Sequence, residues 1–186
     1  FALGANSDTV GAVQLTGGAI TGSGTLTGSS YDLQAGTVSA ILGGTGVAAT
    51  KSGIGAVTLS GANTFTGGLT LSAGTLSVGN AAALGTGTFT ITGGTLDASA
   101  AALTVANALA LNGDFAFAGT NALTLSGAAT LGANRTLTIT AGILTLSGGV
   151  AGTGFDLTKA GTGTLTLSGA NTYTGATIVN AGNLAT

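Results

Sequence analysis

The side chains able to perform acid–base or metal chemistry are few and scattered in this chain. There are five aspartates, Asp8, Asp32, Asp97, Asp114 and Asp156, and no glutamate, histidine or cysteine. The aspartates follow one another after 24, 65, 17 and 42 residues. Glycoside hydrolysis, by contrast, needs two carboxyl groups about 5–10 Å apart. We therefore expect no catalytic residue and no enzymatic activity; a glycan-processing enzyme would need an aspartate cluster on one flank.

Metal, cofactor and nucleic-acid sites lack the residues that they require. Without His, Cys or Glu a transition-metal site has almost no ligands, and an isolated Asp cannot supply the six or more oxygens of a calcium site. The only cationic side chains are Lys51, Arg135 and Lys159, too few to neutralise a run of phosphates. We expect no cofactor, no metal, no nucleic acid and no small-molecule substrate. Asp156 and Lys159 are interpreted as a solvated pair near a turn.

Composition nevertheless predicts a folded chain. Of 186 residues, 44% are hydrophobic, 4% are charged and 36 are glycine, and the mean hydropathy is +0.62. Disorder requires low hydrophobicity and high charge, and this chain has neither. The sequence contains no Met, which leads us to expect a mature piece or a fragment whose targeting segments lie elsewhere.

Apolar and polar residues alternate over short stretches bounded by glycine. Leu165 and Leu167 alternate with threonines, and Phe89 and Ile91 do the same. This period of two indicates short, half-buried strands, with glycine supplying positive-φ corners. Long helices are disfavoured, because each glycine costs about 1 kcal/mol relative to alanine in a helix. For the alanine-rich run 98–111 we predict strand and bend.

A longer period of about 20 residues, the scale of short solenoid repeats, overlies this alternation. The string LTLSG begins at positions 123, 144 and 165, and a hydrophobe-x-Ala/Gly-Gly-x-hydrophobe unit begins at 15, 33, 71, 91, 139 and 179. The gap from 91 to 139 is the longest and predicts a coil that carries an insertion. Short repeats of this kind bury their apolar faces by stacking. The chain is therefore predicted to be all-β, a parallel β-solenoid of roughly nine coils of about 20 residues, about 45 Å long at the spacing of paired strands.

Two segments are close copies of each other. Residues 51–79 and 159–184 each contain a lysine, a stretch close to GTGTLTLSGANTYTG, and a later Ala-Gly corner. Each resembles the autotransporter-associated β-strand repeat. The resemblance implies a right-handed parallel β-helix in the passenger of a Gram-negative type V secretion protein, in which this repeat is non-catalytic and associated with efficient export. It also implies a C-terminal outer-membrane β-barrel as partner, outside this chain, and passage through the periplasm and outer membrane to the cell surface or the medium.

Within the two copies, four residues are predicted to form structural corners: Asn63, Asn171, Gly61 and Gly169. Asparagine tolerates the left-handed backbone of a corner, and its amide can bond to the adjacent coil. Phe65 and Tyr173 follow the asparagines by two residues and are expected to pack as a shelf beside the corner. A sugar-stacking platform at these aromatic residues is the alternative.

The whole chain, 1–186, is thus interpreted as a single solenoid segment of a longer passenger. We expect a structural stalk whose coil-by-coil folding helps to draw the chain outward, since each coil of a solenoid needs only its neighbour. The alternative is an adhesin or a self-assembling surface filament, because solenoid ends expose strand edges that favour end-to-end self-association.

Overall fold

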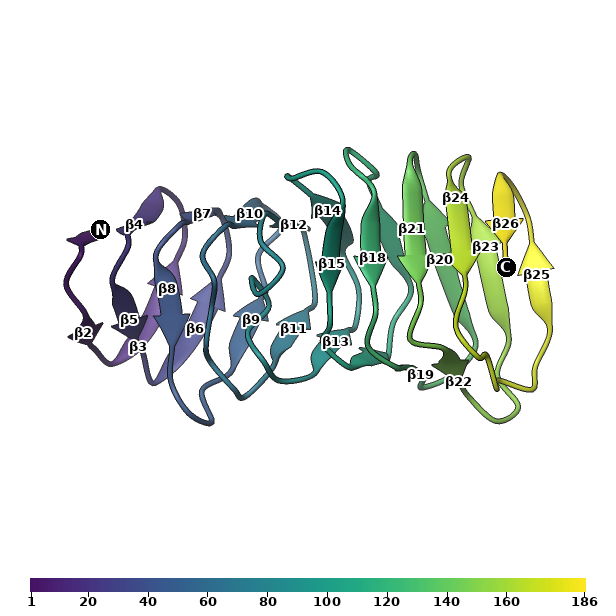
Figure 1. The fold of residues 1–186 in the computed structure, drawn as a ribbon, viewed down its shortest axis with the longest axis horizontal. Coiled ribbons are helices and arrows are strands. Elements are labelled where there is room, and N and C mark those ends of the chain that lie inside the picture. The colour runs from purple at the N-terminus through teal and green to yellow at the C-terminus, as the bar shows by residue number, and fades with distance from the viewer.

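The computed structural model describes all residues from Phe1 to Thr186 and contains strands and turns but no helix. The strands stack along one long axis, with the N-terminus at one end and the C-terminus near the other (Figure 1). Every strand pairing is parallel. No helix long and apolar enough to cross a membrane is present. The prediction of an all-β parallel solenoid of about nine turns is confirmed.

Two long sheets extend along the rod. The ten-stranded sheet comprises β1 (Ala2–Gly4), β4 (Ala19–Gly22), β7 (Gly36–Val38), β10 (Ala56–Leu59), β12 (Thr75–Val78), β14 (Thr95–Ala98), β17 (Phe115–Phe117), β20 (Arg135–Ile139), β23 (Leu157–Ala160) and β25 (Thr177–Val179). The eight-stranded sheet comprises β3 (Ala12–Leu15), β6 (Ser30–Leu33), β9 (Ala49–Lys51), β11 (Leu69–Leu71), β13 (Phe89–Ile91), β16 (Leu109–Leu111), β19 (Ala129–Leu131) and β22 (Val150–Ala151).

The third position of the coil, between a strand of the ten-stranded sheet and the next of the eight-stranded sheet, is discontinuous. A three-stranded sheet comes first, with β2 (Asp8–Thr9), β5 (Thr25–Thr27) and β8 (Ile41–Gly43). A five-stranded sheet follows, with β15 (Leu103–Val105), β18 (Leu123–Leu125), β21 (Ile143–Leu146), β24 (Thr164–Leu167) and β26 (Asn183–Ala185). Between them, residues 60–68 and 79–88 occupy this position without a strand.

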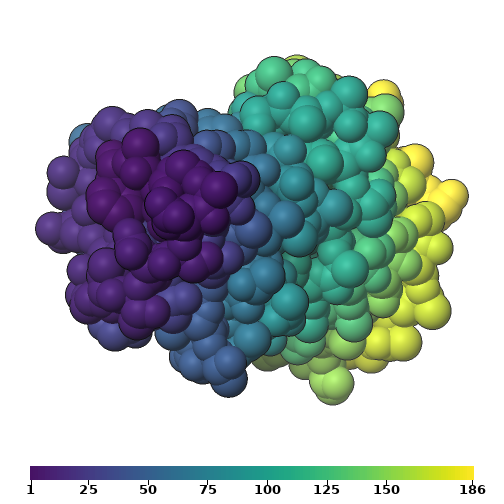
Figure 2. All heavy atoms as spheres, turned by 60° about the vertical axis from the view of Figure 1, so that its left-hand side comes forward, coloured from purple at the N-terminus to yellow at the C-terminus, as the bar shows by residue number.

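The interior consists of apolar rows that run from coil to coil. Leu76 pairs with Leu96, Leu96 with Phe117, and Phe117 with Ile139, and all four side chains are fully buried. These residues belong to one hydrophobic cluster of 40 buried residues, so a single core runs through the rod. In the space-filling view the residue colours follow one another in bands, as expected when each coil contacts mainly its neighbours (Figure 2).

Local predictions agree with the strands. Leu165 and Leu167 lie buried in β24, and Phe89 and Ile91 lie buried in β13, with the intervening threonines turned outward. The alanine-rich run 98–111 consists of the end of β14, a turn, β15 and β16, which confirms strand and bend.

The predicted insertion is wrong. Ile91 pairs with Leu111, and Leu111 with Leu131, so the coils between them are of ordinary length. The chain then passes directly from Leu131, at the end of β19 in the eight-stranded sheet, to β20 in the ten-stranded sheet, which ends at Ile139. The apolar-Gly unit therefore shifts by one sheet: its first four copies join the eight- to the ten-stranded sheet, whereas its last two join the ten- to the five-stranded sheet.

Candidate functional site

The two lysines lie inside the rod. Lys51 ends β9 and Lys159 lies in β23, and the two residues are 0% and 1% exposed. A buried ammonium group is costly unless hydrogen-bond acceptors replace its lost water. The surroundings of both amines therefore determine how the fold tolerates them.

The Lys51 ammonium is held by backbone carbonyls of two coils. Its Nζ donates to the carbonyl of Gly53, in the turn directly after β9, and to the carbonyl of Ala73 at 3.0 Å. Ala73 lies 22 residues later, at the turn between β11 and β12 of the following coil. The contact thus spans one complete coil.

Lys159 repeats this arrangement in the second copy. Its Nζ donates to the carbonyls of Ala160 at 2.8 Å, Gly161 at 2.7 Å and Ala181 at 2.9 Å. Ala181 is again 22 residues further on. Three carbonyls match the three N–H groups of an ammonium.

The predicted pair of Asp156 with Lys159 is wrong, because the amine faces the interior. Asp156 accepts hydrogen bonds from the backbone N–H of Ala176 at 2.7 Å and from the side chain of Asn134 at 3.4 Å. The one ion pair in the structure joins Arg135 to Asp114 at 3.9 Å. The sequence could not reveal the burial of Lys159, because the acceptors of its amine are backbone carbonyls and no particular side chain marks their positions.

Burial lowers the pKa of both lysines below the ordinary 10.5, since removal of water disfavours the charged form. For Lys51 the nearby charge of Asp32 acts in the opposite direction and raises the pKa. The carbonyl oxygens provide the compensating dipoles for the ammonium in both copies.

Asn63 joins three coils through its side-chain amide. Its Oδ1 accepts a hydrogen bond from the backbone N–H of Leu42 at 2.8 Å, and its Nδ2 donates to the carbonyl of Ala83 at 2.6 Å. The Leu42 carbonyl in turn accepts from the N–H of Thr64 at 2.8 Å. Leu42 lies in β8, the last strand of the three-stranded sheet. The amide oxygen therefore takes the place of a backbone carbonyl that a further strand would have presented.

Asn171 occupies the same position in the second copy, but at the end of another sheet. Its Oδ1 accepts from the N–H of Val150 at 2.9 Å, and the Val150 carbonyl accepts from the N–H of Thr172 at 2.8 Å. Val150 begins β22, the last strand of the eight-stranded sheet. The left-handed backbone predicted for Asn63 and Asn171 is wrong, because Ala102 is the one non-glycine residue with positive φ.

Gly61 and Gly169, two residues before these asparagines, do not have a positive φ, so backbone conformation does not explain the glycine. The reason is the close approach of the neighbouring coil. A Cβ built on Gly61 would lie 2.1 Å from the carbonyl oxygen of Ala40, and one on Gly169 would lie 2.1 Å from the backbone nitrogen of Gly149. Each glycine thus lets its loop pack directly on the backbone of the preceding coil.

The aromatic residues of the two copies differ in exposure. Phe65 is fully buried, with its ring 5.9 Å from that of Tyr31 in a tilted arrangement. A sugar-stacking role is therefore wrong for Phe65. Tyr173 is half-buried, and its hydroxyl lies 2.5 Å from that of Thr177.

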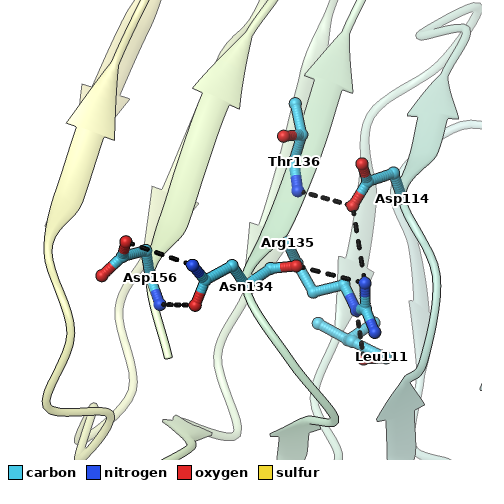
Figure 3. Close-up of polar contacts among 6 residues, drawn as sticks. All are labelled: Leu111, Asp114, Asn134, Arg135, Thr136 and Asp156. Carbon is cyan, nitrogen blue, oxygen red and sulfur yellow. Dashed lines mark hydrogen bonds and ion pairs between the residues drawn. The ribbon is translucent and has the colours of Figure 1, made fainter. Parts of the chain in front are cut away.

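Side chains near the turns before β17, β20 and β23 form a polar ladder that the sequence patterns did not reveal (Figure 3). Asp114 accepts a hydrogen bond from the N–H of Thr136 at 2.9 Å, and Asn134 accepts one from the N–H of Asp156 at 3.0 Å. The Arg135 Nε donates to the carbonyl of Leu111 at 3.0 Å. These groups bind the backbone of neighbouring coils. Polar residues that recur at about the period of the coil were the available signal.

Asp32 anchors a second polar row on the eight-stranded sheet. It accepts hydrogen bonds from Gln14 at 3.0 Å, from Gln34 at 2.7 Å and from the Ser52 hydroxyl. These bonds, that of Gln14 contributing most, lower the pKa of Asp32 below its usual 3.8. Nowhere in the chain do three His, Cys, Asp or Glu side chains gather as a metal site.

Comparison with known proteins adds one family. The sequence model of the passenger-associated-transport-repeat matches at residues 50–78 and again at 157–185. No curated protein and no solved structure matches the chain. Both matched segments begin one or two residues before a buried lysine, include the loop of Asn63 or Asn171 and end in the coil that covers that lysine. Residues 50–78 and 157–185 therefore match the passenger-associated-transport repeat, and the chain is a β-solenoid consistent with an autotransporter passenger repeat segment.

Proposed function

We propose that the chain is a structural stalk in the passenger of a secreted or surface-exposed bacterial autotransporter, and that its coil-by-coil folding assists export. The segment would reach the surface of a Gram-negative cell through the periplasm and outer membrane, linked to a C-terminal translocator domain. The observation that carries this proposal is the recurrence, in both repeats, of the same hydrogen bonds from a lysine to the next coil.

Such contacts suit folding that advances from one coil to the next. Most side-chain bonds that join coils span 18 to 24 residues, for example from Gln14 to Asp32 and from Arg135 to Leu111. The stability of a stacked array is approximately a sum of unit and nearest-neighbour contributions. Each coil that closes therefore releases free energy without waiting for a distant part of the chain, and this release opposes backward movement.

The corner residues fit the same role. In this proposal Asn63 and Asn171 terminate a sheet locally, and Gly61 and Gly169 allow the loop to rest on the coil beneath. In this proposal the segment is non-catalytic, and the engagement of the ladder aspartates Asp114 and Asp156 with backbone N–H groups supports a structural role for them.

Surface yield of the full-length protein tests the proposal. Deleting residues 159–184 should lower the amount displayed at the cell surface while the transcript level stays unchanged. The matched control deletes residues 103–122, one complete coil outside both repeats, because Leu103 pairs with Leu123 and the register is preserved. Equal surface yields from the parent and the repeat deletion would contradict the proposal.

End-to-end association of two copies is a second candidate. The coil containing β1 to β3 has an apolar depression of about 460 Å³ lined by residues that include Val13, Leu15 and Ile20. The edge of β1 lies at one end of the ten-stranded sheet and that of β25 at the other, so a second copy could continue the parallel ladder. Sedimentation should then show mass that rises with concentration, and a monomer at all concentrations would exclude this candidate.

A further inference from the structure

Both repeats contain the same lysine contact, although the two lysines lie on different sheets of the rod. Lys51 projects from the eight-stranded sheet, whereas Lys159 projects from the ten-stranded sheet. Both amines nevertheless reach the carbonyl of an alanine 22 residues later, in an Ala-Gly turn. Because the same hydrogen bond forms on two different sheets, we infer that the sequence of the repeat determines it.

The contact is complete only when the following coil is in place. Around Lys51, the Gly53 carbonyl comes from the turn directly after the lysine, whereas the Ala73 carbonyl belongs to the next coil. Around Lys159, the Ala181 carbonyl is the one supplied by the next coil. Neither amine forms an ion pair with a carboxylate. Each ammonium thus depends on carbonyl dipoles from two successive coils.

We propose that Lys51 and Lys159 are positioning residues that latch the following coil, each ammonium fixing the Ala-Gly turn of that coil in register by its hydrogen bond to Ala73 or Ala181. The latch rests on the proposed function in that it identifies the residues by which a repeat would secure newly folded chain. It acts by geometry, because only a turn that presents a backbone carbonyl to the amine can complete the contact.

Chemical labelling of the amines measures whether the latch closes. Lys51 and Lys159 are the only lysines, so a pulse of an amine-acylating reagent followed by mass spectrometry observes them individually. The reference is the Ile54→Lys variant, whose new amine replaces a side chain that is 96% exposed. Both native lysines should label at least about tenfold more slowly than the reference, because labelling requires local opening of the covering coil. Labelling at the reference rate would overturn the latch.

Substitution tests whether the amine orders the coil that covers it. Lys51→Met retains most of the packing volume but leaves the Ala73 carbonyl without its donor, so hydrogen exchange at residues 72–78 should accelerate by about tenfold or more. Residues 180–185, which cover the intact Lys159, are the control within the same molecule. Lys159→Met should give the reciprocal pattern. Unchanged exchange in the covering coil, or equal acceleration in both, would overturn the proposal.

These readouts separate the latch from the proposed export role. Labelling and exchange are measured on the folded chain and involve no secretion. A closed latch together with unaltered surface yield in the deletion strain would contradict the export role alone. Rapid labelling together with reduced yield would contradict the latch alone.

Discussion

The Asn63 side-chain oxygen accepts the backbone N–H of Leu42 at 2.8 Å, where the next parallel strand would otherwise have provided a carbonyl. The same relationship joins Asn171 to Val150 at 2.9 Å, at the end of a different sheet. A carboxamide has the donor and acceptor of a peptide group. In each repeat, one asparagine therefore accepts a hydrogen bond from a backbone N–H of a strand that has no further strand beside it.

Replacing Asn63 should destabilise the rod. Asn63→Leu keeps the branching and the number of side-chain heavy atoms but leaves the Leu42 N–H and the Ala83 carbonyl unpaired, and each buried unpaired group costs about 1–3 kcal/mol. We expect the free energy of unfolding in urea to fall by about 2–6 kcal/mol. The control Asn183→Ala, at an exposed position without a side-chain hydrogen bond, should change it by less than about 0.5 kcal/mol. Equal effects of the two changes would show that the amide of Asn63 contributes nothing particular.

Gly61 is expected to tolerate no side chain. In Gly61→Ala the new Cβ would lie 2.1 Å from the Ala40 oxygen, so the backbone must shift, at a cost of about 1–3 kcal/mol or more. Gly17→Ala is the matched control, because its Cβ would meet nothing within 4 Å and its φ is not positive. Thermal unfolding should show a lower Tm for the first variant and an unchanged or slightly higher Tm for the second. A Gly61→Ala protein as stable as the parent would contradict the close approach of the two coils.

Acid should weaken the row anchored by Asp32. Its hydrogen bonds hold the folded pKa below 3.8, so the stability that they contribute is present above that value and is lost as the pH falls through the folded pKa. The denaturation midpoint of the parent should therefore drop between about pH 5 and pH 2 more than that of Asp32→Asn, which has no carboxylate to protonate. Parallel pH profiles of the two proteins would contradict this assignment.

Raising the pH should act on the lysines in the same direction as on Asp32, because all three pKa values are lowered. Because burial lowers the pKa of Lys51 and Lys159, the unfolded chain holds more protons than the folded chain between the lowered values and 10.5. The free energy of unfolding should therefore rise with pH through that window. The readings are taken below 10.0, above which Tyr31, whose pKa is raised by burial, would reverse the trend. The double variant Lys51→Met/Lys159→Met should lack the rise, and a rise of equal slope in that variant would contradict the assignment.

The fold was predictable because its signals are local and repeated. Leu165 and Leu167 alternate with threonine, and the same pattern returns at Leu123 and Leu144, which requires stacked strands. The shift of the apolar-Gly unit from one sheet to the next was not predictable. All the sheets share one alternation, so the long spacing between Ile91 and Ile139 could equally indicate an insertion.

The site was less predictable than the fold. The sequence singled out Asn63 and Asn171 because they recur in nearly identical strings. It assigned Lys159 to the surface because charge is the stronger signal, whereas the acceptors that bury it are carbonyls of Ala160, Gly161 and Ala181. Backbone acceptors become visible only once the path of the chain is known.

Distances between spin labels along one outward row test the stacked-coil arrangement most directly. Thr50 pairs with Thr70, Thr70 with Thr90, Thr90 with Ala110, and Ala110 with Thr130, all in the eight-stranded sheet. With one label at position 50 and a second at 70, 90 or 130, the labels lie one, two or four coils apart. The backbone separation should increase by about 4.8 Å per coil, to about 19 Å for the last pair. Separations that do not increase with the number of coils between the labels would contradict the solenoid and everything derived from it.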